Sequence, residues 1–197
     1  MGRSSGNRQK HENPNPVQRF LIDRFHSSVV DLAMRTSAGR ILEVGCGEGF
    51  VLEALADAEI EAQLHGVDFS SEAIAEADRR LAGRAEVWVG DARDLLDRAD
   101  SYDLVMMLEV LEHIEDPAQM LPVLEGLTKG PVLLSVPWEP WFRGLNMARG
   151  KNVAQFGNDP EHVNHWTQRQ FLDFVSQSFD VTIVGSVFPW TLVLAER

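Results

Sequence analysis

Short apolar runs alternate with segments of helical periodicity from Gly39 onward, and this alternation constrains the fold more than any other feature. Five apolar runs lie at 41–44, 64–67, 86–89, 102–107 and 132–136. The stretches between them are long enough to hold a helix. Helical spacing of apolar residues is found in three intervening stretches, near 48–58, 70–82 and 116–127. In the last of these, Asp116 is expected to cap the helix and Pro117 to occupy its first turn. Strands that alternate with helices predict a parallel sheet with right-handed crossovers on both faces.

Two further apolar runs, at 181–187 and 191–195, follow a predicted helix near 167–178. Their connection is too short for a helical crossover, so they are expected to pair antiparallel. A helix is also predicted from Pro16, because apolar residues recur there at helical spacing before the first strand. The predicted fold class is therefore α/β: a doubly wound, seven-stranded, mostly parallel sheet with an antiparallel last strand and an added N-terminal helix.

Length and composition favour one domain. The 197 residues are 44% hydrophobic, which is enough to bury one sizeable core. Residues 1–13 are polar and lack apolar anchors, so we expect a disordered tail followed by a single domain at 14–197. The stretch at about 137–166 is rich in Trp, Gly, Asn and Pro, and we expect it to form a lid or substrate segment over the active site.

The charge distribution argues against nucleic acid as a partner. The net charge is −12, and residues 1–40 hold seven Lys/Arg against three Asp/Glu, so the remainder carries about −16. Such a body repels phosphate backbones. No apolar run approaches the roughly 20 residues that span a bilayer, and the N-terminus lacks the apolar stretch of a secretory signal. With Cys46 as the only cysteine, these features predict a cytoplasmic protein without a membrane span.

The strongest local motif runs from Glu43 to Gly49, where the first predicted strand leads into a glycine-rich turn that opens a helix. Glycine allows the backbone to approach a ligand closely. The G-x-G-x-G spacing is tighter than the G-x-G-x-x-G of dinucleotide-binding folds. A purely structural turn is the alternative interpretation of this motif alone.

Two acidic residues follow the next two predicted strands. Asp68 lies 19 residues after Gly49, where an acid that binds ribose hydroxyls belongs. Phe69 could pack beside a base, and Ser70 could cap the next helix. Asp91, followed by Ala92, could accept a hydrogen bond from an adenine amine. Because the carboxyl ends of parallel strands meet at one edge of a sheet, the three motifs are expected to converge on one crevice.

This order of motifs over residues 40–136 resembles that of the class I S-adenosylmethionine-dependent methyltransferases. The resemblance implies that the glycine-rich turn contacts the methionine moiety, that Asp68 holds the ribose, and that residues after the fourth strand lie beside the reactive methyl. The predicted cofactor-binding residues are Glu43, Gly45, Cys46, Gly47, Asp68, Phe69, Ser70, Asp91, Ala92, Leu108 and Glu109.

The fourth strand runs into an E-x-x-E-H segment that could bind a metal or move a proton. If it were helical, Glu109, Glu112 and His113 would share one face. The segment resembles that of ubiquinone-biosynthesis O-methyltransferases and of small-RNA 2'-O-methyltransferases, where the equivalent cluster helps bind a divalent metal. A fourth ligand would come from His162 or His165, and the match to the small-RNA enzymes favours His162. Relatives that need no metal also carry this segment.

Without a metal, an imidazole could remove the proton of the methyl acceptor. The candidate catalytic residues are His113, His162 and His165, because histidine titrates near neutrality. A packed, structural role is the alternative for His113.

The predicted function is S-adenosylmethionine-dependent methyl transfer to a small molecule, with oxygen as the first choice of target atom. Aromatic residues from Trp138 to Phe142 suggest an aromatic or apolar acceptor, although Trp138 and Trp141 could equally be packed into the core. The alternatives are a metal-dependent RNA 2'-O-methyltransferase, a nicotinamide dehydrogenase, and a cofactor-binding protein without methyl transfer activity. The glycine spacing argues against the dehydrogenase.

Overall fold

The computed structural model describes residues 15–98, 101–139, 141 and 163–197. The predicted disordered tail at 1–13 and most of the predicted lid at 137–166 therefore lie outside the described residues. Within the described part, no helix has the length and apolar character needed to cross a membrane.

One sheet of seven strands organises the molecule, in the order β3-β2-β1-β4-β5-β7-β6. Strands β1 to β5 pair in parallel, whereas β7 runs antiparallel to both of its neighbours, β5 and β6. The predicted sheet is therefore confirmed, with its single antiparallel strand. The strands are β1 (Arg40–Val44), β2 (Gln63–Asp68), β3 (Glu86–Val89), β4 (Leu104–Leu108), β5 (Val132–Pro137), β6 (Asp180–Val187) and β7 (Trp190–Glu196).

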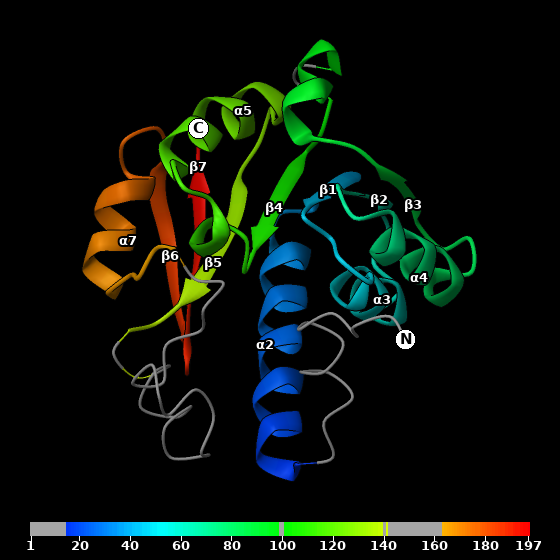
Figure 1. Ribbon diagram of the computed structural model, residues 1–197, viewed down its shortest axis with the longest axis horizontal. Helices are drawn as coiled ribbons and strands as arrows, with labels where there is room; N and C mark the ends of the chain where they lie inside the picture. The colour runs from blue at the N-terminus through cyan, green and yellow to red at the C-terminus, as the bar shows by residue number, and fades with distance from the viewer. Residues whose placement is uncertain (1–14, 99–100, 140, 142–162) are drawn as a thin grey trace.

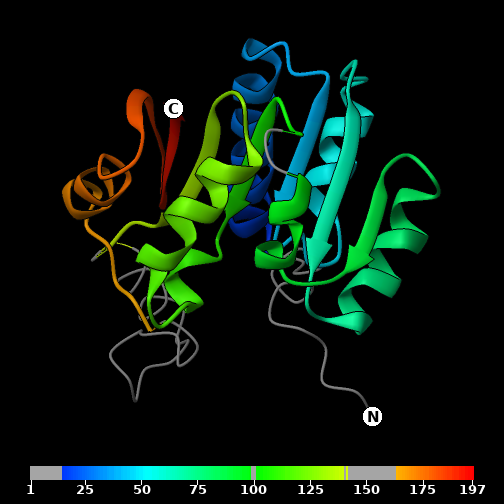
Figure 2. The same cartoon turned by 90° about the horizontal axis from the view of Figure 1, so that it is seen from above.

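Helices cover both faces of this sheet, as a doubly wound fold requires (Figures 1 and 2). The α-helices are α2 (Pro16–Arg35), α3 (Phe50–Asp57), α4 (Ser71–Leu81), α5 (Met120–Leu127) and α7 (Gln168–Val175). Three short 3-10 helices are η1 (Ala92–Arg98), η2 (Leu111–His113) and η3 (Pro117–Gln119). One core lies between the sheet and α2, α3 and α4, and the other lies between the sheet and η1, α5 and α7.

The two cores explain why the central strands read as continuous apolar runs. Every residue of β4 is buried, because its alternate side chains enter opposite cores. Leu104 and Met106 pack with the α2–α3–α4 layer, whereas Val105 and Met107 pack with the α5–α7 layer. Burial of such a side chain stabilises the fold by roughly 2 kcal/mol.

The N-terminal helix α2 forms as its sequence predicts. Asn15 caps it by accepting a hydrogen bond from Val17 N at 2.9 Å, and Pro16 occupies the first turn. Its apolar stripe, which includes Phe25, Val29 and Leu32, is buried against the sheet. In Figure 1, α2 starts on the side of the molecule where β4 and β5 end.

Two predicted helices differ from the structure at their starts. The helix expected at 48–58 begins only at Phe50, because Gly49 has a left-handed conformation and still belongs to the turn. The helix expected at 116–127 is divided into η3 and α5. The Asp116 carboxylate does not cap a backbone N–H there, but accepts a hydrogen bond from the Gln119 side chain at 2.9 Å.

Candidate functional site

The glycine-rich turn between β1 and α3 is built from left-handed residues. Gly45, Gly47 and Gly49 have φ angles of 74°, 51° and 77°. At Gly45 a Cβ atom would also lie only 2.5 Å from Cγ2 of Val110, which follows β4. The turn therefore requires glycine for its conformation and for its close approach to the end of β4.

Asp68 joins this turn to the end of β2. Its Oδ2 accepts a hydrogen bond from Gly47 N at 2.9 Å, and its Oδ1 accepts one from Ser70 N at 2.8 Å. Ser70 Oγ caps α4 by accepting from Ala73 N, as expected from the sequence. Phe69, predicted beside a base, is 84% exposed. The predicted meeting of the first two motifs is thus confirmed in the fold, while their ligand contacts stay predictions.

Glu43 lies beneath the turn as a buried carboxyl group, only 3% exposed. Burial, and then the negative charge of Asp68, raise the pKa of Glu43 well above its ordinary value. Its Oε2 atom is buried without a hydrogen-bond partner. Such a group is costly in the folded protein, and it is the kind of acceptor that a bound cationic or N–H group would satisfy.

Cys46 contributes to the turn through its backbone. Its N–H donates to Val67 O at 3.2 Å, and its side chain packs in the α2–α3–α4 core. Burial and nearby carboxylates, that of Glu43 foremost, raise the pKa of the thiol. The thiol therefore stays protonated and is a poor nucleophile at neutral pH.

The third motif reaches the same edge. Gly90 N donates to Asp68 O at 3.0 Å, which brings the end of β3 beside the end of β2. The Asp91 carboxylate is held by Arg93, whose Nε lies 2.9 Å from Oδ1, and this ion pair lowers the pKa of Asp91. Ala92 is buried at the start of η1. An adenine amine at Asp91 would share the carboxylate with Arg93.

The segment after β4 departs from the sequence interpretation. Leu108 ends the strand and is buried, and Glu109 then takes a left-handed backbone conformation with φ of 58°. This turn separates Glu109 from η2, which begins only at Leu111 and is three residues long. The condition for Glu109, Glu112 and His113 to share one helical face is therefore not met.

The Glu109 carboxylate points instead toward β5 and β7. Oε2 accepts a hydrogen bond from Trp190 Nε1 at 2.6 Å, and Oε1 accepts one from Ser135 Oγ at 3.2 Å. Glu112 is 1% exposed, and its Oε1 lies 4.0 Å from Nε2 of His113, whose side chain is 36% exposed.

The predicted metal site is not supported. Among residues 15–98, 101–139, 141 and 163–197, no group of three or more His, Cys, Asp or Glu side chains is arranged to hold a metal ion. His162, the favoured fourth ligand, lies outside the described residues. The interpretation as a metal-dependent RNA methyltransferase therefore has no support from the described residues.

The segment that carries His165 does dock beside η2. Val163 N and Asn164 N both donate to Glu112 O, at 2.8 and 3.0 Å, and the Asn164 side chain donates to Leu111 O at 3.5 Å. This brings the exposed His165 near the chain that bears His113. Asn164 could not be singled out from the sequence, because its partners lie 50 and 53 residues earlier.

Three aromatic rings form a cluster where β5 ends. Trp138, Trp141 and Phe188 lie edge to face, with centroid separations of 6.3 to 6.5 Å. Trp141 is 54% exposed. Trp138 N donates to Pro189 O at 2.8 Å, so the connection between β6 and β7 holds the start of the predicted lid. Phe188, Pro189 and Trp190 were missed from the sequence, which offers only an aromatic-rich connection between two strands.

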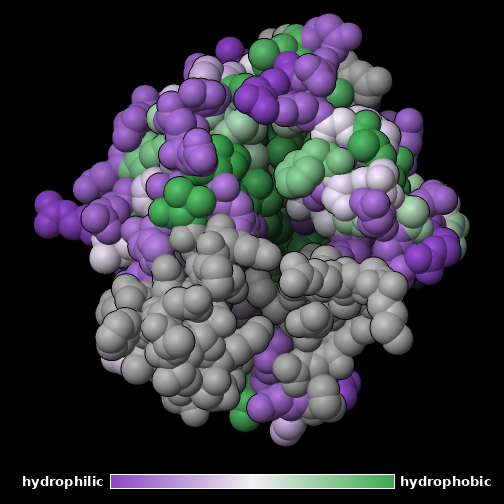
Figure 3. Space-filling model, in the orientation of Figure 1, coloured by the Kyte–Doolittle hydropathy of each residue, from purple (hydrophilic) through white to green (hydrophobic). Residues whose placement is uncertain are grey.

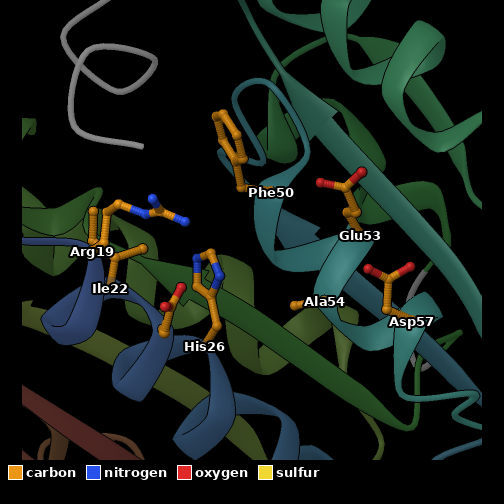
Figure 4. Close-up of a pocket in the computed structure, with 8 residues that line it drawn as sticks. Arg19, Ile22, His26, Phe50, Glu53, Ala54 and Asp57 are labelled. Carbon is orange, nitrogen blue, oxygen red and sulfur yellow. The ribbon is translucent and has the colours of Figure 1, made fainter. Parts of the chain in front are cut away.

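Figure 3 shows a face that is hollowed near its centre, with apolar residues at its floor. A cavity of about 260 Å³ lies between α2 and α3. Figure 4 shows the residues that line this cavity. Arg80 lies beside this cavity, with its guanidinium 3.8 Å from the ring centre of Phe50. The lining residues are Arg19, Ile22, Asp23, His26, Phe50, Glu53, Ala54 and Asp57, none of which the sequence singled out.

Part of the chain is similar in sequence to known proteins. Residues 41–129 match the family model described as a methyltransferase domain. The chain is 30% identical over 114 residues to the mitochondrial ubiquinone biosynthesis O-methyltransferase of Candida albicans, an alignment covering 55% of this chain and 34% of that protein. It is 32% identical over 120 residues to a probable S-adenosylmethionine-dependent methyltransferase of Mycobacterium tuberculosis, covering 61% of this chain and 43% of that protein.

Solved structures match over a larger part of the fold. The plantazolicin methyltransferase BpumL, solved with a monoazolic desmethylPZN analog and SAH, superposes with a TM-score of 0.73 at 18% identity. That alignment covers 97% of this chain and 88% of BpumL, whereas the curated relatives are matched over less than half of their length. The structural likeness therefore concerns the whole fold, and the sequence likeness concerns its first part.

Proposed function

We propose that this chain methylates a hydroxyl group of a small molecule. The premise is that it is a class I S-adenosylmethionine-dependent methyltransferase, by its fold and by the match of residues 41–129 to a methyltransferase domain. The observation that carries the proposal is the joining of the glycine-rich turn to Asp68 at adjacent strand ends. Ligands of open α/β sheets bind at this edge.

The residues at this edge fit the cofactor. At Gly45 and Gly47 the left-handed backbone carries no side chain, so the methionine moiety can approach it closely, and the orphaned Glu43 oxygen lies beneath it. Asp68 is suited to accept hydrogen bonds from the ribose hydroxyls, and Asp91 from the adenine amine. A ribose at Asp68 would replace or share the hydrogen bonds that Gly47 N and Ser70 N now donate.

The chemistry needs an oriented acceptor and a place for its proton. Bound S-adenosylmethionine supplies a methyl group on a positively charged sulfur, which passes to the acceptor oxygen as the sulfur–carbon bond breaks and leaves a neutral thioether. His113 and His165 are the described candidates to take the hydroxyl proton. We expect the acceptor to lie near the end of β4, with its oxygen in line with the methyl group.

The aromatic cluster of Trp138, Trp141 and Phe188 is the basis for proposing a ring-containing or apolar acceptor. Exposed edges and faces of such rings favour contact with another flat, apolar group. The ubiquinone biosynthesis relatives support oxygen as the target atom, since they are named as O-methyltransferases.

Cofactor binding is tested by calorimetric titration of the protein with S-adenosylhomocysteine. Asp68→Ala should weaken binding by about 10- to 100-fold, because each lost hydrogen bond to a charged acceptor is worth roughly 1.5 to 3 kcal/mol. Asp78→Ala, on the exposed side of α4, is the matched control and should bind as the unaltered protein does. Absence of binding to the unaltered, folded protein would overturn the proposal.

The acceptor is then sought by mass spectrometry after incubation with S-adenosylmethionine. The panel pairs phenols and catechols with saturated alcohols of similar size, and adds a short RNA. Methylation of the ring compounds, weakened by Trp141→Ala, supports the acceptor class. Methylation of the RNA alone would contradict the small-molecule assignment.

A further inference from the structure

The indole of Trp190 and the carboxylate of Glu109 form a contact between distant parts of the chain. Trp190 opens β7, and its Nε1 donates to Glu109 Oε2 at 2.6 Å. Ser135, buried in β5, donates to Oε1 at 3.2 Å and accepts a hydrogen bond from Glu109 N at the same distance. Each oxygen of the carboxylate therefore has a donor from a different strand, and the side chain is fixed at two points.

The backbone of Glu109 is strained in a way that distinguishes it from similar residues. Four described residues other than glycine have a positive φ: Ser37, Glu59, Ala82 and Glu109. The first three are exposed and follow the ends of helices, where left-handed residues commonly occur. Glu109 alone follows a strand and is partly buried, at the carboxyl edge of the sheet. Strain of this kind persists where the surroundings hold it, and it gathers at functional sites.

Packing holds the indole in place. Its ring lies 5.0 Å from the ring of Phe25, which is buried on the inner side of α2. The backbone of Trp190 pairs with Pro137 of β5 and with Val187 of β6. The N–H donor is therefore aimed by three elements, α2, β5 and β6, rather than by a flexible loop.

We propose that Trp190 is a positioning residue, which aims the Glu109 carboxylate at the methyl acceptor. Glu109 lies next to Val110, whose side chain packs on Gly45 of the glycine-rich turn, and its partner Trp190 follows Phe188 of the aromatic cluster, so the carboxylate is tied to both regions. There it can accept a hydrogen bond from the acceptor hydroxyl and orient its oxygen. This role rests on the proposed function, but the Trp190–Glu109 contact itself does not.

The contact is tested first in the protein without ligands, by two-dimensional NMR of the five tryptophan indole N–H groups. Trp190→Phe assigns one resonance by its loss. We expect that resonance to lie downfield, as a hydrogen bond to a carboxylate requires, and to move upfield in Glu109→Gln. The Trp166 resonance is the internal control, because its buried Nε1 has no hydrogen-bond partner. A Trp190 resonance that does not respond to Glu109→Gln would overturn the proposal.

Positioning is tested next by steady-state kinetics with an acceptor from the panel above. Trp190→Phe keeps a ring against Phe25 but removes the donor, and should lower kcat about tenfold with KM for S-adenosylmethionine within about threefold. Trp166→Phe, the same replacement at an indole whose N–H has no hydrogen-bond partner, should retain most of kcat. Equal losses of kcat in the two variants would assign Trp190 a packing role only and overturn the proposal.

The two experiments separate this inference from the proposed function. If S-adenosylhomocysteine does not bind the unaltered protein, the proposed function fails, while the indole resonances still report whether Trp190 holds Glu109. If it binds and Trp190→Phe retains full kcat, the proposed function stands and the positioning role is wrong.

Discussion

Two carboxyl groups, at opposite ends of the parallel strands, differ in their hydrogen bonding and in the direction of their pKa shifts. Asp103, just before β4, accepts hydrogen bonds from Gly39 N and Arg40 N at 3.0 and 2.8 Å and lies 2.9 Å from Lys129 Nζ. These contacts lower the pKa of Asp103. Glu43, at the end of β1, is buried with one oxygen lacking a hydrogen bond, and its pKa is raised.

The contrast shows what each edge contributes. At the amino ends of the strands, the amino edge, satisfied polar contacts join β1, β4 and the end of α5, and these contacts stabilise the fold. At the carboxyl ends of the strands, the carboxyl edge, a buried acid and left-handed residues lower the stability of the fold. Such features suit a site that is completed by a ligand. The experiments below test whether stability and binding separate between the two edges in this way.

The largest effect is expected from Gly45→Ala. The new Cβ would meet Val110 at 2.5 Å on a backbone with positive φ, so we expect S-adenosylhomocysteine affinity to fall by about 100-fold or more and stability to fall by about 1–3 kcal/mol. Gly83→Ala is the matched control, because Gly83 has a similar φ of 81° with no atom within 4 Å of its Cβ position. Equal binding by the two variants would show that the turn is not part of the site.

Asp103→Ala should destabilise the fold by about 2 kcal/mol in denaturant unfolding at pH 7, without changing ligand affinity. Because the folded pKa of Asp103 is lowered, its contribution is present above the unfolded pKa and is lost as pH falls through the folded value. The difference between variant and unaltered protein should therefore shrink below about pH 4. Asp173→Ala, at an exposed position of α7, should change stability by less than about 0.5 kcal/mol.

Glu43→Gln should have the opposite sign and stabilise the fold by about 1 kcal/mol at pH 7. The folded protein holds the Glu43 proton to higher pH than the unfolded chain does, so this carboxyl group destabilises the fold as pH rises above its unfolded pKa. The gain in the variant should vanish below about pH 4. Weaker S-adenosylhomocysteine binding should accompany the gain, whereas a variant that binds more tightly would contradict the assigned role of Glu43.

Lys129→Met should have the smallest effect. Its ammonium is more than half exposed, so loss of the ion pair with Asp103 should cost at most about 0.5 kcal/mol and less at high salt. Thermal unfolding at low and high ionic strength measures this. A cost comparable to that of Asp103→Ala would mean that the ion pair, rather than the backbone hydrogen bonds, holds the amino edge.

The sheet could be predicted from the sequence because each of its strands is a local apolar run. Gly45, Gly47 and Asp68 could also be predicted, since a turn and a strand end are readable from a few neighbouring residues. The partners of Glu109 could not, because Trp190 lies 81 residues away and meets it only through the order of β4, β5 and β7. The left-handed backbone of Glu109 was likewise hidden, since glutamate carries no preference for it. Because of that dihedral angle, Glu109 does not share a helix with Glu112 and His113.

The position of β7 also has a consequence for the order of folding. The strand follows β6 in sequence but lies between β5 and β6 in the sheet, so one edge of β5 stays unpaired until the hairpin of β6 and β7 has formed. Strands β1 to β4, which carry the glycine-rich turn and Asp68, precede β6 and β7 in the chain and can pair with one another before those strands are synthesised. A nascent chain would thus acquire the half with the glycine-rich turn first, and would gain the hydrogen bond from Trp190 to Glu109 only in the final stage of assembly.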